Sequence, residues 1–207
     1  MLAICLDLEG VLIPEIWINV AERTGISALT RTTRDEPDYD RLMSYRLEIL
    51  DQNDIKMGDI TSTIESMDPM EGATEFLASL ESRWPTLILS DTFSQFAKPM
   101  MKKLGNPTLL CHTLVIDDTG RIEDWEIRYD DHKRKTVESL TEMNYKVIAA
   151  GDSYNDTSML SAASAGILFR PPENVIEEFP QFPVAMDYSE LIDAIESAAT
   201  DLGELWN

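Results

Sequence analysis

The sequence has 207 residues, of which 38 are Asp or Glu and 17 are Lys or Arg, so its formal net charge is −21 at pH 7. This charge argues against nucleic acids and anionic membranes as partners. No apolar stretch approaches the roughly 18 residues of a membrane-spanning helix. The two cysteines do not make a disulfide framework, and the N-terminus lacks the basic stretch of a signal peptide. We therefore expect one domain with an insertion, located in a reducing cytoplasm.

The first third of the chain predicts a buried strand and then a small helical unit. Residues 2–8 are too short and too continuously apolar for a helix, so a strand is expected there. Pro14 then opens a helix, and Gly25 follows its end. The remaining parts of this unit, which spans 14–68, are a polar loop over 30–40 with Pro37, a helix over 39–51 and a short helix capped by Asp59 and ending near Met67.

Beyond residue 68, strands and helices alternate, which is typical of an α/β fold with a mainly parallel sheet. The expected strands cover 86–89, 109–116, 122–129, 147–150 and 165–169, the second and third forming a hairpin around Asp117 to Gly120. The expected helices cover 71–83, 93–104 with a bend at Pro99, 133–143, 156–163 and 188–202. The predicted architecture is a Rossmann-like parallel-sheet core (1–13 and 69–207) with a helical cap (14–68) inserted after the first strand.

Acidic residues follow two of these strands directly. Asp7 and Glu9 come after the first strand, and Asp152, Asn155 and Asp156 follow the run that ends at Ala150. If the two strands are neighbours in a parallel sheet, their acids meet at the edge where open α/β sheets bind ligands. Carboxylates at one point suit a hard cation such as Mg²⁺, which Asp7 and Asp152 could share. Helix capping alone remains an alternative for Asn155 and Asp156.

The pair Asp7 and Glu9 has the chemistry of a phosphoryl-transfer site. Residues i and i+2 of a strand point the same way, so both carboxylates can approach one substrate. One can attack phosphorus to form an aspartyl phosphate, and the other can protonate the leaving oxygen and then activate water. The alternative for a lone Asp after a strand is a turn cap.

Two further segments could hold a phosphate. Ser90 and Asp91 follow the expected strand at 86–89, where a hydroxyl and backbone N–H groups can bind phosphate oxygens, although this is also an ordinary capping sequence. Lys133 opens a helix beside His132, Arg134 and Lys135, and its ammonium could neutralise phosphate. A solvated basic patch is the simpler interpretation for Arg134 and Lys135.

Together these segments resemble the four ordered motifs of the haloacid dehalogenase-like phosphohydrolases: Asp7-x-Glu9-x-Val11, Ser90-Asp91, Lys133 and Gly151-Asp152-x-x-Asn155-Asp156. The helical insertion resembles the cap of the phosphoserine phosphatase branch. The chain is most similar to bacterial members of that branch that also transfer phosphate from phosphoserine to homoserine. The shared segments are Asp7 to Pro14, Thr33-Arg34-Asp35, Leu89 to Phe93, Pro107 to His112, Ala149 to Thr157 and Glu178 to Phe182.

The resemblance implies a Mg²⁺-dependent phosphatase of L-serine biosynthesis, with a role for each matching residue. Asp7 would be the phosphorylated nucleophile, Glu9 the general acid/base and a metal ligand through its backbone carbonyl, and Asp152 the third metal ligand. The groups that hold phosphate or metal-linked atoms would be Ser90, Asp91, Lys133 and Asn155, with Asp156 in support. In the cap, Glu15 would bind the substrate ammonium and Arg46 its carboxylate, which suits the bidentate fork of Arg.

Glu9 departs from the pattern, because most phosphatases of this family carry Asp there. The extra methylene shifts the acid, and a misplacement of about 1 Å can cost on the order of 10²-fold in rate. Our hypothesis is that water is then poorly activated, which leaves the aspartyl phosphate open to the homoserine hydroxyl.

Other functions stay open at this point. The cap selects the substrate in this family, so the chain could instead cleave another small phosphomonoester, such as a sugar or methylthio-pentulose phosphate. A catalytically silent Mg²⁺- or phosphate-binding protein is a further alternative, and a dehalogenase is disfavoured by Glu9 and Asp152. We expect small-molecule partners, no nucleic acid or membrane, either a monomer or a homodimer, and a loose tail at Leu205-Trp206-Asn207.

Overall fold

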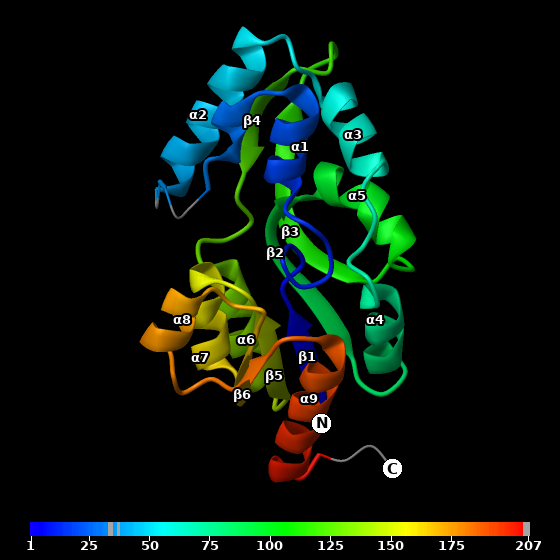
Figure 1. Ribbon diagram of the computed structural model, residues 1–207. Coiled ribbons are helices and arrows are strands. Elements are labelled where there is room, and N and C mark those ends of the chain that lie inside the picture. The colour runs from blue at the N-terminus through cyan, green and yellow to red at the C-terminus, as the bar shows by residue number, and fades with distance from the viewer. Residues whose placement is uncertain (33–34, 37, 205–207) are drawn as a thin grey trace.

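The structure, a computed structural model, describes residues 1–32, 35–36 and 38–204 (Figure 1). Thr33, Arg34 and Pro37 of the expected loop, and the expected loose tail from Leu205 to Asn207, lie outside the described residues. In the described part, seven strands form one sheet in the order β4-β3-β2-β1-β5-β6-β7. Neighbouring strands are parallel except β3 and β4, which pair antiparallel. The expected α/β fold with a mainly parallel sheet is confirmed.

The strand at the centre of the sheet is the first apolar run of the chain. All five of its residues are buried, as expected for a strand covered on both faces. Alternate side chains enter different layers, so Ile4 and Leu6 join one hydrophobic cluster and Cys5 the other. The strands are β1 (Leu2–Leu6), β2 (Thr86–Phe93), β3 (Thr108–Ile116), β4 (Ile122–Glu126), β5 (Lys146–Gly151), β6 (Ala165–Phe169) and β7 (Val184–Ala185).

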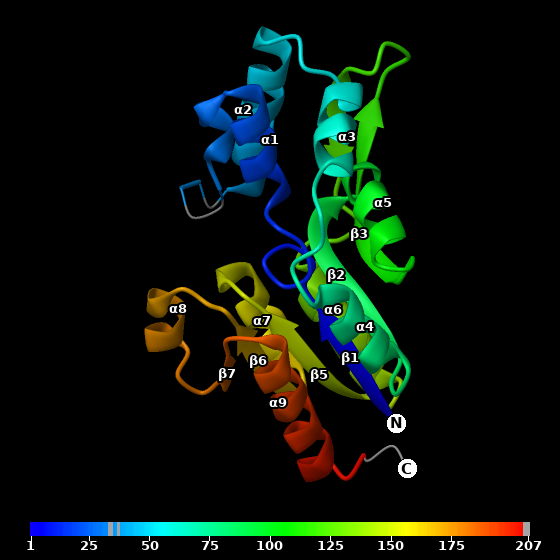
Figure 2. The same ribbon diagram turned by 45° about the vertical axis from the view of Figure 1, so that its right-hand side comes forward.

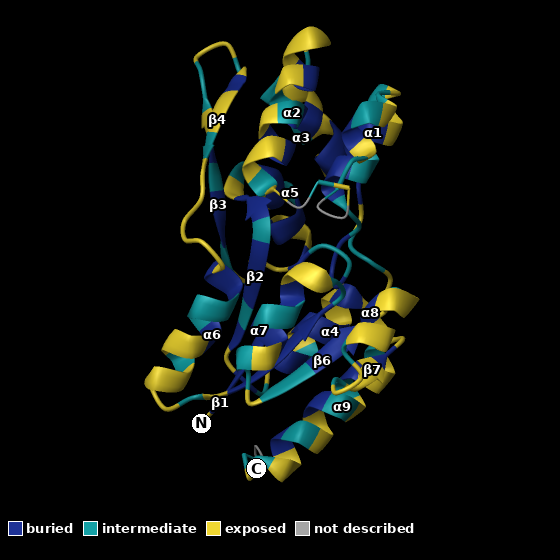
Figure 3. Ribbon diagram, turned by 90° about the vertical axis from the view of Figure 1, so that its left-hand side faces the viewer, coloured by how far each residue is buried: buried dark blue, intermediate teal, exposed yellow. Residues whose placement is uncertain are grey.

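Helices cover both faces of this sheet, and their outward sides are exposed (Figures 2 and 3). On one face α4 (Ala73–Glu81) and α9 (Tyr188–Asp201) bury apolar stripes. On the other face lie α6 (His132–Glu142), α7 (Thr157–Ala162) and α8 (Glu173–Glu178). This three-layer arrangement leaves the carboxyl edge of β1 and β5 open toward the rest of the chain.

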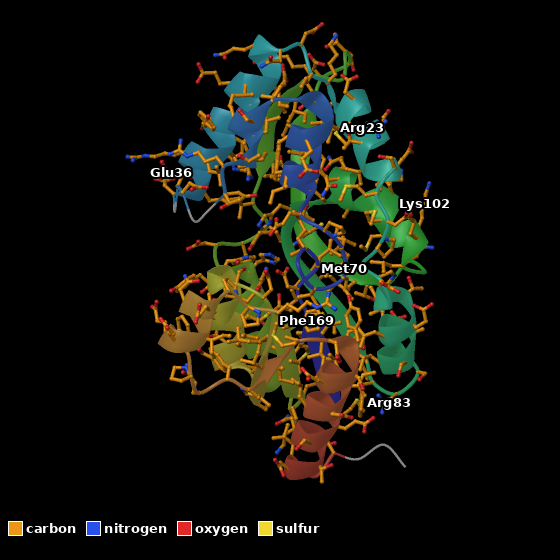
Figure 4. The ribbon with its side chains drawn as sticks, viewed as in Figure 1. Arg23, Glu36, Met70, Arg83, Lys102 and Phe169 are labelled. Atoms are coloured by element: carbon orange, nitrogen blue, oxygen red, sulfur yellow. The ribbon has the colours of Figure 1, made fainter. Side chains whose placement is uncertain are left out.

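A helical cap lies above that edge (Figures 1 and 2). It consists of α1 (Ile16–Thr24), the 3-10 helix η1 (Ser27–Thr30), α2 (Tyr39–Gln52) and α3 (Met57–Glu65). Arg23, labelled in Figure 4, joins two of these helices because its Nη1 donates to Ser66 Oγ at 2.7 Å. Helix α5 (Ser94–Lys103) connects cap and core, since the Phe96 ring meets Trp17 edge-on with centroids 5.4 Å apart.

The β3–β4 hairpin extends from the core along the cap. Its turn is joined to the start of α3 by a 2.8 Å hydrogen bond from Met57 N–H to the Gly120 carbonyl. At the same place Arg121 Nε donates to Asp51 Oδ1 at 2.8 Å. The cap therefore contacts a hairpin that we expected to belong to the core alone.

Several expected boundaries are wrong, and the one at β2 matters for function. The strand continues through Ser90 and Asp91 to Phe93 instead of ending at residue 89. The continuation is possible because pairing with β3 shifts between Leu89 and Phe93, which leaves the intervening residues outside the regular ladder. Phe93 then packs against Phe96 with ring centroids 5.7 Å apart, and this contact stabilises the extended backbone at the end of β2.

Other boundaries moved by a few residues. Helix α1 begins at Ile16 rather than Pro14, and α3 begins at Met57, where Asp59 lies in its first turn and accepts from the Lys56 N–H at 2.9 Å. The first strand ends at Leu6, β4 ends at Glu126, α4 covers Ala73–Glu81, and residues 154–156 form a 3-10 turn (η2, Tyr154–Asp156) before α7. Helix α8 and strand β7 were not expected. Among the residues that the structure describes, none of the helices has the length and apolar character to cross a bilayer.

Candidate active site

The two acidic segments meet at the carboxyl edge of the sheet because β1 and β5 are neighbours. The Asp7 N–H donates to the Ala150 carbonyl at 2.9 Å, which continues the ladder past the end of β1. The carboxylate oxygens of Asp7, Asp152 and Asp156 lie within 4.8 Å of one another. The sequence thus predicted this convergence from strand ends alone.

Glycine is required where the turn after β1 passes Asp152. Gly10 has a φ of +77°, and a Cβ added there would lie 2.6 Å from the Asp152 carboxylate. A second close approach occurs at Gly151, whose Cβ would lie 2.4 Å from the Asp156 carboxylate. Both glycines let backbone come against a carboxylate, so the acids are held in place by the surrounding chain.

Lys133 is the cation of this cluster and is 2 % exposed. It lies in the first turn of α6, and its Nζ is 2.8 Å from both Asp7 Oδ1 and Asp156 Oδ1. Burial alone would lower the pKa of Lys133, but the charges of Asp156, Asp7 and Asp91 raise it well above its ordinary value. The ammonium is therefore charged and lies next to the expected nucleophile.

Asp156 is fully buried and organises its neighbours. Its Oδ1 accepts from Lys133, and its Oδ2 accepts from the backbone N–H groups of Asp152 at 3.0 Å and Ser153 at 3.2 Å. Because both oxygens are engaged, Asp156 is suited to orient Lys133 and the turn that carries Asp152 rather than to bind a ligand itself.

Asp7 and Asp152 are acids whose negative charges are not fully balanced by the nearby ammonium of Lys133. Burial and then the charge of Asp156 raise the pKa of Asp7 well above its usual range, and the same causes raise the pKa of Asp152 to about 7. A divalent cation between the two acids would relieve this repulsion, and carboxylate oxygens are the ligands that Mg²⁺ prefers. The residues present therefore suit the Mg²⁺ that the sequence led us to expect.

Asp91 faces the cluster from β2, and Ser90 precedes it in that strand. Ser90 is buried, and its Oγ accepts from the Thr92 N–H at 3.2 Å. The Asp91 carboxylate accepts from Asn155 Nδ2 at 3.1 Å and lies 3.4 Å from Lys133 Nζ. The structure thus gathers Asp91, Lys133 and Asn155 at one place, whereas the Ser90 hydroxyl contacts the backbone of β2.

Glu9 lies between this cluster and the cap. Its Oε2 accepts from the Ile16 N–H at 2.8 Å. Burial, followed by the charge of Glu15, raises the pKa of Glu9 to about 7. A carboxyl group with a pKa near neutrality can both donate and accept a proton at physiological pH, which is what a general acid/base requires.

Arg46 projects from α2 into the same region and is 6 % exposed. Its guanidinium lies over the Trp17 ring, with Cζ 4.5 Å from the centroid, and Nη2 donates to the Arg31 carbonyl at 2.8 Å. Burial lowers the pKa of Arg46 to about 10, against the opposing charges of Tyr39, Glu9 and Glu15, so it remains a cation. Its buried Nε has no hydrogen-bond partner in the described part of the chain. This N–H of Arg46 is therefore available to a ligand anion. Glu15 lies near enough for its charge to raise the pKa of Glu9.

The two histidines of the chain also reach this site, and our sequence reasoning missed them. His112 on β3 and His132 at the start of α6 are buried against Asp91. His132 was noted only for its position directly before Lys133. His112 ended the shared segment Pro107 to His112, but it lies on a different strand and nothing in the sequence placed it beside Asp91.

Comparison with known proteins gives a consistent picture. The family model for haloacid dehalogenase-like hydrolases matches residues 1–164. Phosphoserine phosphatase ThrH of Pseudomonas aeruginosa is 58 % identical over 187 residues, which cover 90 % of this chain and 91 % of that protein. A phosphoserine phosphatase of Pseudomonas syringae pv. tomato is 55 % identical over 187 residues, covering 90 % of this chain and 79 % of the relative.

A solved structure has the same fold. A phospho-aspartyl intermediate analogue of phosphoserine phosphatase superposes with a TM-score of 0.76 and 20 % identity, covering 93 % of this chain and 97 % of that one. At this identity the likeness concerns the fold.

Proposed function

Because this chain belongs to the haloacid dehalogenase-like hydrolase family, we propose that it is a phosphoserine phosphatase that forms an aspartyl phosphate on Asp7. The observation that carries the proposal is the contact of the buried Lys133 ammonium with Asp7, 2.8 Å apart, beside the raised pKa of Glu9. The names of the two Pseudomonas relatives support phosphoserine as the substrate.

In the first step, the Asp7 carboxylate attacks the phosphorus of phosphoserine. The new bond joins an Asp7 oxygen to phosphorus, and the bond between phosphorus and the serine oxygen breaks. Glu9 in its protonated form gives its proton to the leaving serine oxygen. The Lys133 ammonium lies where negative charge builds up on the transferring group, which lowers the barrier.

In the second step, Glu9 accepts a proton from a water molecule, and the resulting hydroxide attacks phosphorus. The Asp7–phosphorus bond breaks, inorganic phosphate leaves, and the Asp7 carboxylate is restored. Glu9 is then protonated again for the next turnover. A pKa of about 7 serves both steps, since neither protonation state is costly near neutral pH.

Mg²⁺ would be held by the carboxylates of Asp7 and Asp152 and by the backbone carbonyl of Glu9. When bound, it supplies positive charge that offsets the charge of the acids and of the substrate phosphate. Asp156 holds the turn that carries Asp152, so it supports this site through backbone hydrogen bonds.

The cap would select an amino-acid phosphate through Glu15 and Arg46. The free Nε of Arg46 and its neighbouring guanidinium nitrogens suit a carboxylate, and Glu15 supplies an anion for the ammonium group. With this pair the enzyme would act in L-serine formation, and the buried free thiols of Cys5 and Cys111 support a reducing cytoplasm as its location.

Homoserine is the proposed second acceptor. If the longer side chain of Glu9 activates water poorly, the homoserine hydroxyl can attack the phosphorus instead. Glu9 then accepts the hydroxyl proton, the Asp7–phosphorus bond breaks, and phosphohomoserine leaves. Free phosphate and phosphohomoserine then share one intermediate.

The test is incubation with phosphoserine and Mg²⁺, with and without homoserine, followed by measurement of both products, with Asp7→Asn as the blank. Phosphate release that Asp7→Asn abolishes is expected, and phosphohomoserine would add the transfer activity. If phosphoserine is inert while other small phosphomonoesters are cleaved, the substrate assignment to Glu15 and Arg46 is wrong.

A further inference from the structure

The two histidines of the chain converge on one oxygen of Asp91. His132 Nε2 lies 3.2 Å and His112 Nε2 3.7 Å from Asp91 Oδ1. Both imidazoles are 3 % exposed, and their ring centroids are 4.6 Å apart at an interplanar angle of 62°. Two buried imidazoles from β3 and α6 therefore meet the half-buried Asp91 carboxylate of β2 beside the active site.

The other oxygen of Asp91 faces the residues proposed to hold phosphate. Asp91 Oδ2 accepts from Asn155 Nδ2 at 3.1 Å and lies 3.4 Å from Lys133 Nζ. Asp91 thus has the histidines on one side and Lys133 with Asn155 on the other.

Asp91 itself is a poor phosphate ligand. Burial alone would raise its pKa, but its contacts with Lys133, His112, His132 and Asn155 hold the pKa well below its usual range. An ionised carboxylate is only a hydrogen-bond acceptor and repels a phosphate dianion. We therefore expect Asp91 to act on the substrate through the donors that it holds, Lys133 and Asn155.

We propose that His112 and His132 are positioning residues, which fix the Asp91 carboxylate so that it orients Lys133 and Asn155 toward the transferring phosphate. The proposal rests on the proposed function for the roles of Lys133 and Asn155. The convergence of the imidazoles on Asp91 Oδ1 carries it.

The position of His132 supports this role. Both of its ring nitrogens are buried and have no hydrogen bond within the described ranges. An unsatisfied buried imidazole is costly, so the proximity of Nε2 to the Asp91 charge is a favourable polar interaction for this side chain. His132 also precedes Lys133 in the first turn of α6, so a shift of its ring would displace the lysine as well.

Two histidines and a carboxylate are also a donor set for a transition metal, but the hydrogen bonding of His112 argues against this. The Arg128 N–H donates to His112 Nδ1 at 3.2 Å, so that nitrogen is an acceptor and the proton of the neutral ring is on Nε2. To bind a metal beside Asp91 through Nε2, His112 would need its proton on Nδ1 instead, where it would face the Arg128 N–H. His112 is thus set to present an N–H to Asp91.

The first test is a double-mutant cycle between His132 and Asp91. We expect His132→Leu and Asp91→Asn each to lower kcat about 10-fold, because the phosphate-binding donors lose their alignment. KM for phosphoserine should not rise, since Asp91→Asn removes a charge that repels phosphate. In the Asp91→Asn background, His132→Leu should have no further effect. His132→Gln, whose amide can take the place of Nε2, should stay within about 3-fold of the native kcat.

The matched pair at His112 separates packing from donation. His112→Asn can keep an acceptor for the Arg128 N–H but loses the contact with Asp91, so kcat should fall about 10-fold with unchanged thermal unfolding. His112→Gln can keep a donor near the Nε2 position, so kcat should be largely retained.

Three results would overturn the proposal. The first is an equal loss of kcat from His132→Leu in the native and in the Asp91→Asn background. The second is a native kcat in both His132→Leu and His112→Asn. The third is a stoichiometric transition metal that elemental analysis finds in the native protein and not in either variant. If the native protein cleaves no phosphomonoester, the proposed function fails. The double-mutant cycle is then measured as the affinity of each variant for inorganic phosphate in the presence of Mg²⁺, by calorimetry. Coupled losses of phosphate affinity would support the positioning role, and independent or absent losses would contradict it.

Discussion

The Ile16 N–H donates a 2.8 Å hydrogen bond to Glu9 Oε2, so the first turn of the cap helix α1 directly contacts the proposed general acid/base. The cap therefore takes part in setting the environment of Glu9, together with Glu15, whose charge raises the pKa of Glu9. In the proposed function, substrate selection by Glu15 and proton transfer by Glu9 would therefore share this short segment of the chain.

Glu9→Gln should lower kcat by about 10²- to 10⁴-fold but stabilise the protein at alkaline pH. In the native protein the pKa of Glu9 is about 7 and its ordinary value is 4.5, so the folded state binds more protons between these values. Stability contributed by Glu9 is therefore present below pH 4.5 and is lost as the pH rises through 7. We expect the variant to be more stable than the native protein by about 3 kcal/mol at pH 8 and by only about 1 kcal/mol at pH 5.

Urea unfolding in EDTA at both pH values measures this difference. Asp7 and Asp152 also titrate, but they are common to both proteins. An equal gap at pH 5 and pH 8 would show that the Glu9 carboxyl is not the group responsible.

Gly10→Ala should weaken the proposed Mg²⁺ site, and Gly25→Ala is its matched control. Both residues have positive φ, +77° and +70°, so each substitution should cost about 1 kcal/mol of stability from backbone strain. Only at Gly10 would the new Cβ meet a side chain, the Asp152 carboxylate at 2.6 Å, whereas Gly25 has nothing within 4 Å. We expect the Mg²⁺ concentration for half-maximal activity to rise about 10-fold in Gly10→Ala alone. A parallel rise in Gly25→Ala would assign the effect to general destabilisation.

Arg46→Ala should remove the selectivity for an amino-acid substrate. Loss of a charge-assisted hydrogen bond to the substrate carboxylate should lower kcat/KM for phosphoserine about 10²-fold and leave that for p-nitrophenyl phosphate within about 3-fold. Arg41→Ala on the same helix is the control, because that side chain is 77 % exposed. Equal losses on both substrates would make Arg46 a structural residue that packs on Trp17.

Glu9→Asp should shift the fate of the aspartyl phosphate from homoserine to water. The shorter acid would be better placed to activate water, so the ratio of phosphohomoserine to free phosphate should fall several-fold. Both products are measured in one reaction at fixed homoserine. An unchanged ratio would show that the side-chain length of Glu9 does not decide between homoserine and water as the acceptor.

The core of the site was predictable because it depends on local patterns and one topological rule. A continuous apolar run before Asp7 and another before Asp152 identify two strands, and parallel pairing brings their ends together. The resemblance to the haloacid dehalogenase-like hydrolases, confirmed by the family model over residues 1–164, rests on the same residues.

The surroundings of Asp91 were not predictable from local sequence. We ended the expected strand at residue 89, where the apolar run gives way to Ser90-Asp91-Thr92, and Asp is depleted in strands. In the structure Asp91 is tolerated because pairing is interrupted there and partners arrive from β3 and α6, among them His112. Contacts between residues this far apart leave no periodic signal, and the short elements α8 and β7 were missed because two to six residues carry little pattern.

The contact of the β3–β4 hairpin with the cap limits how this protein can be recombined with its relatives. Exchanging residues 14–68 for another cap would leave the hairpin tip without its partners. The Gly120 carbonyl would lose the Met57 N–H as its donor, and Arg121 would lose Asp51. A chimera meant to accept a new substrate should therefore carry the hairpin from the same parent as the cap. The part of the chain to exchange for a new specificity is then discontinuous in sequence, and consists of residues 14–68 together with residues 108–126.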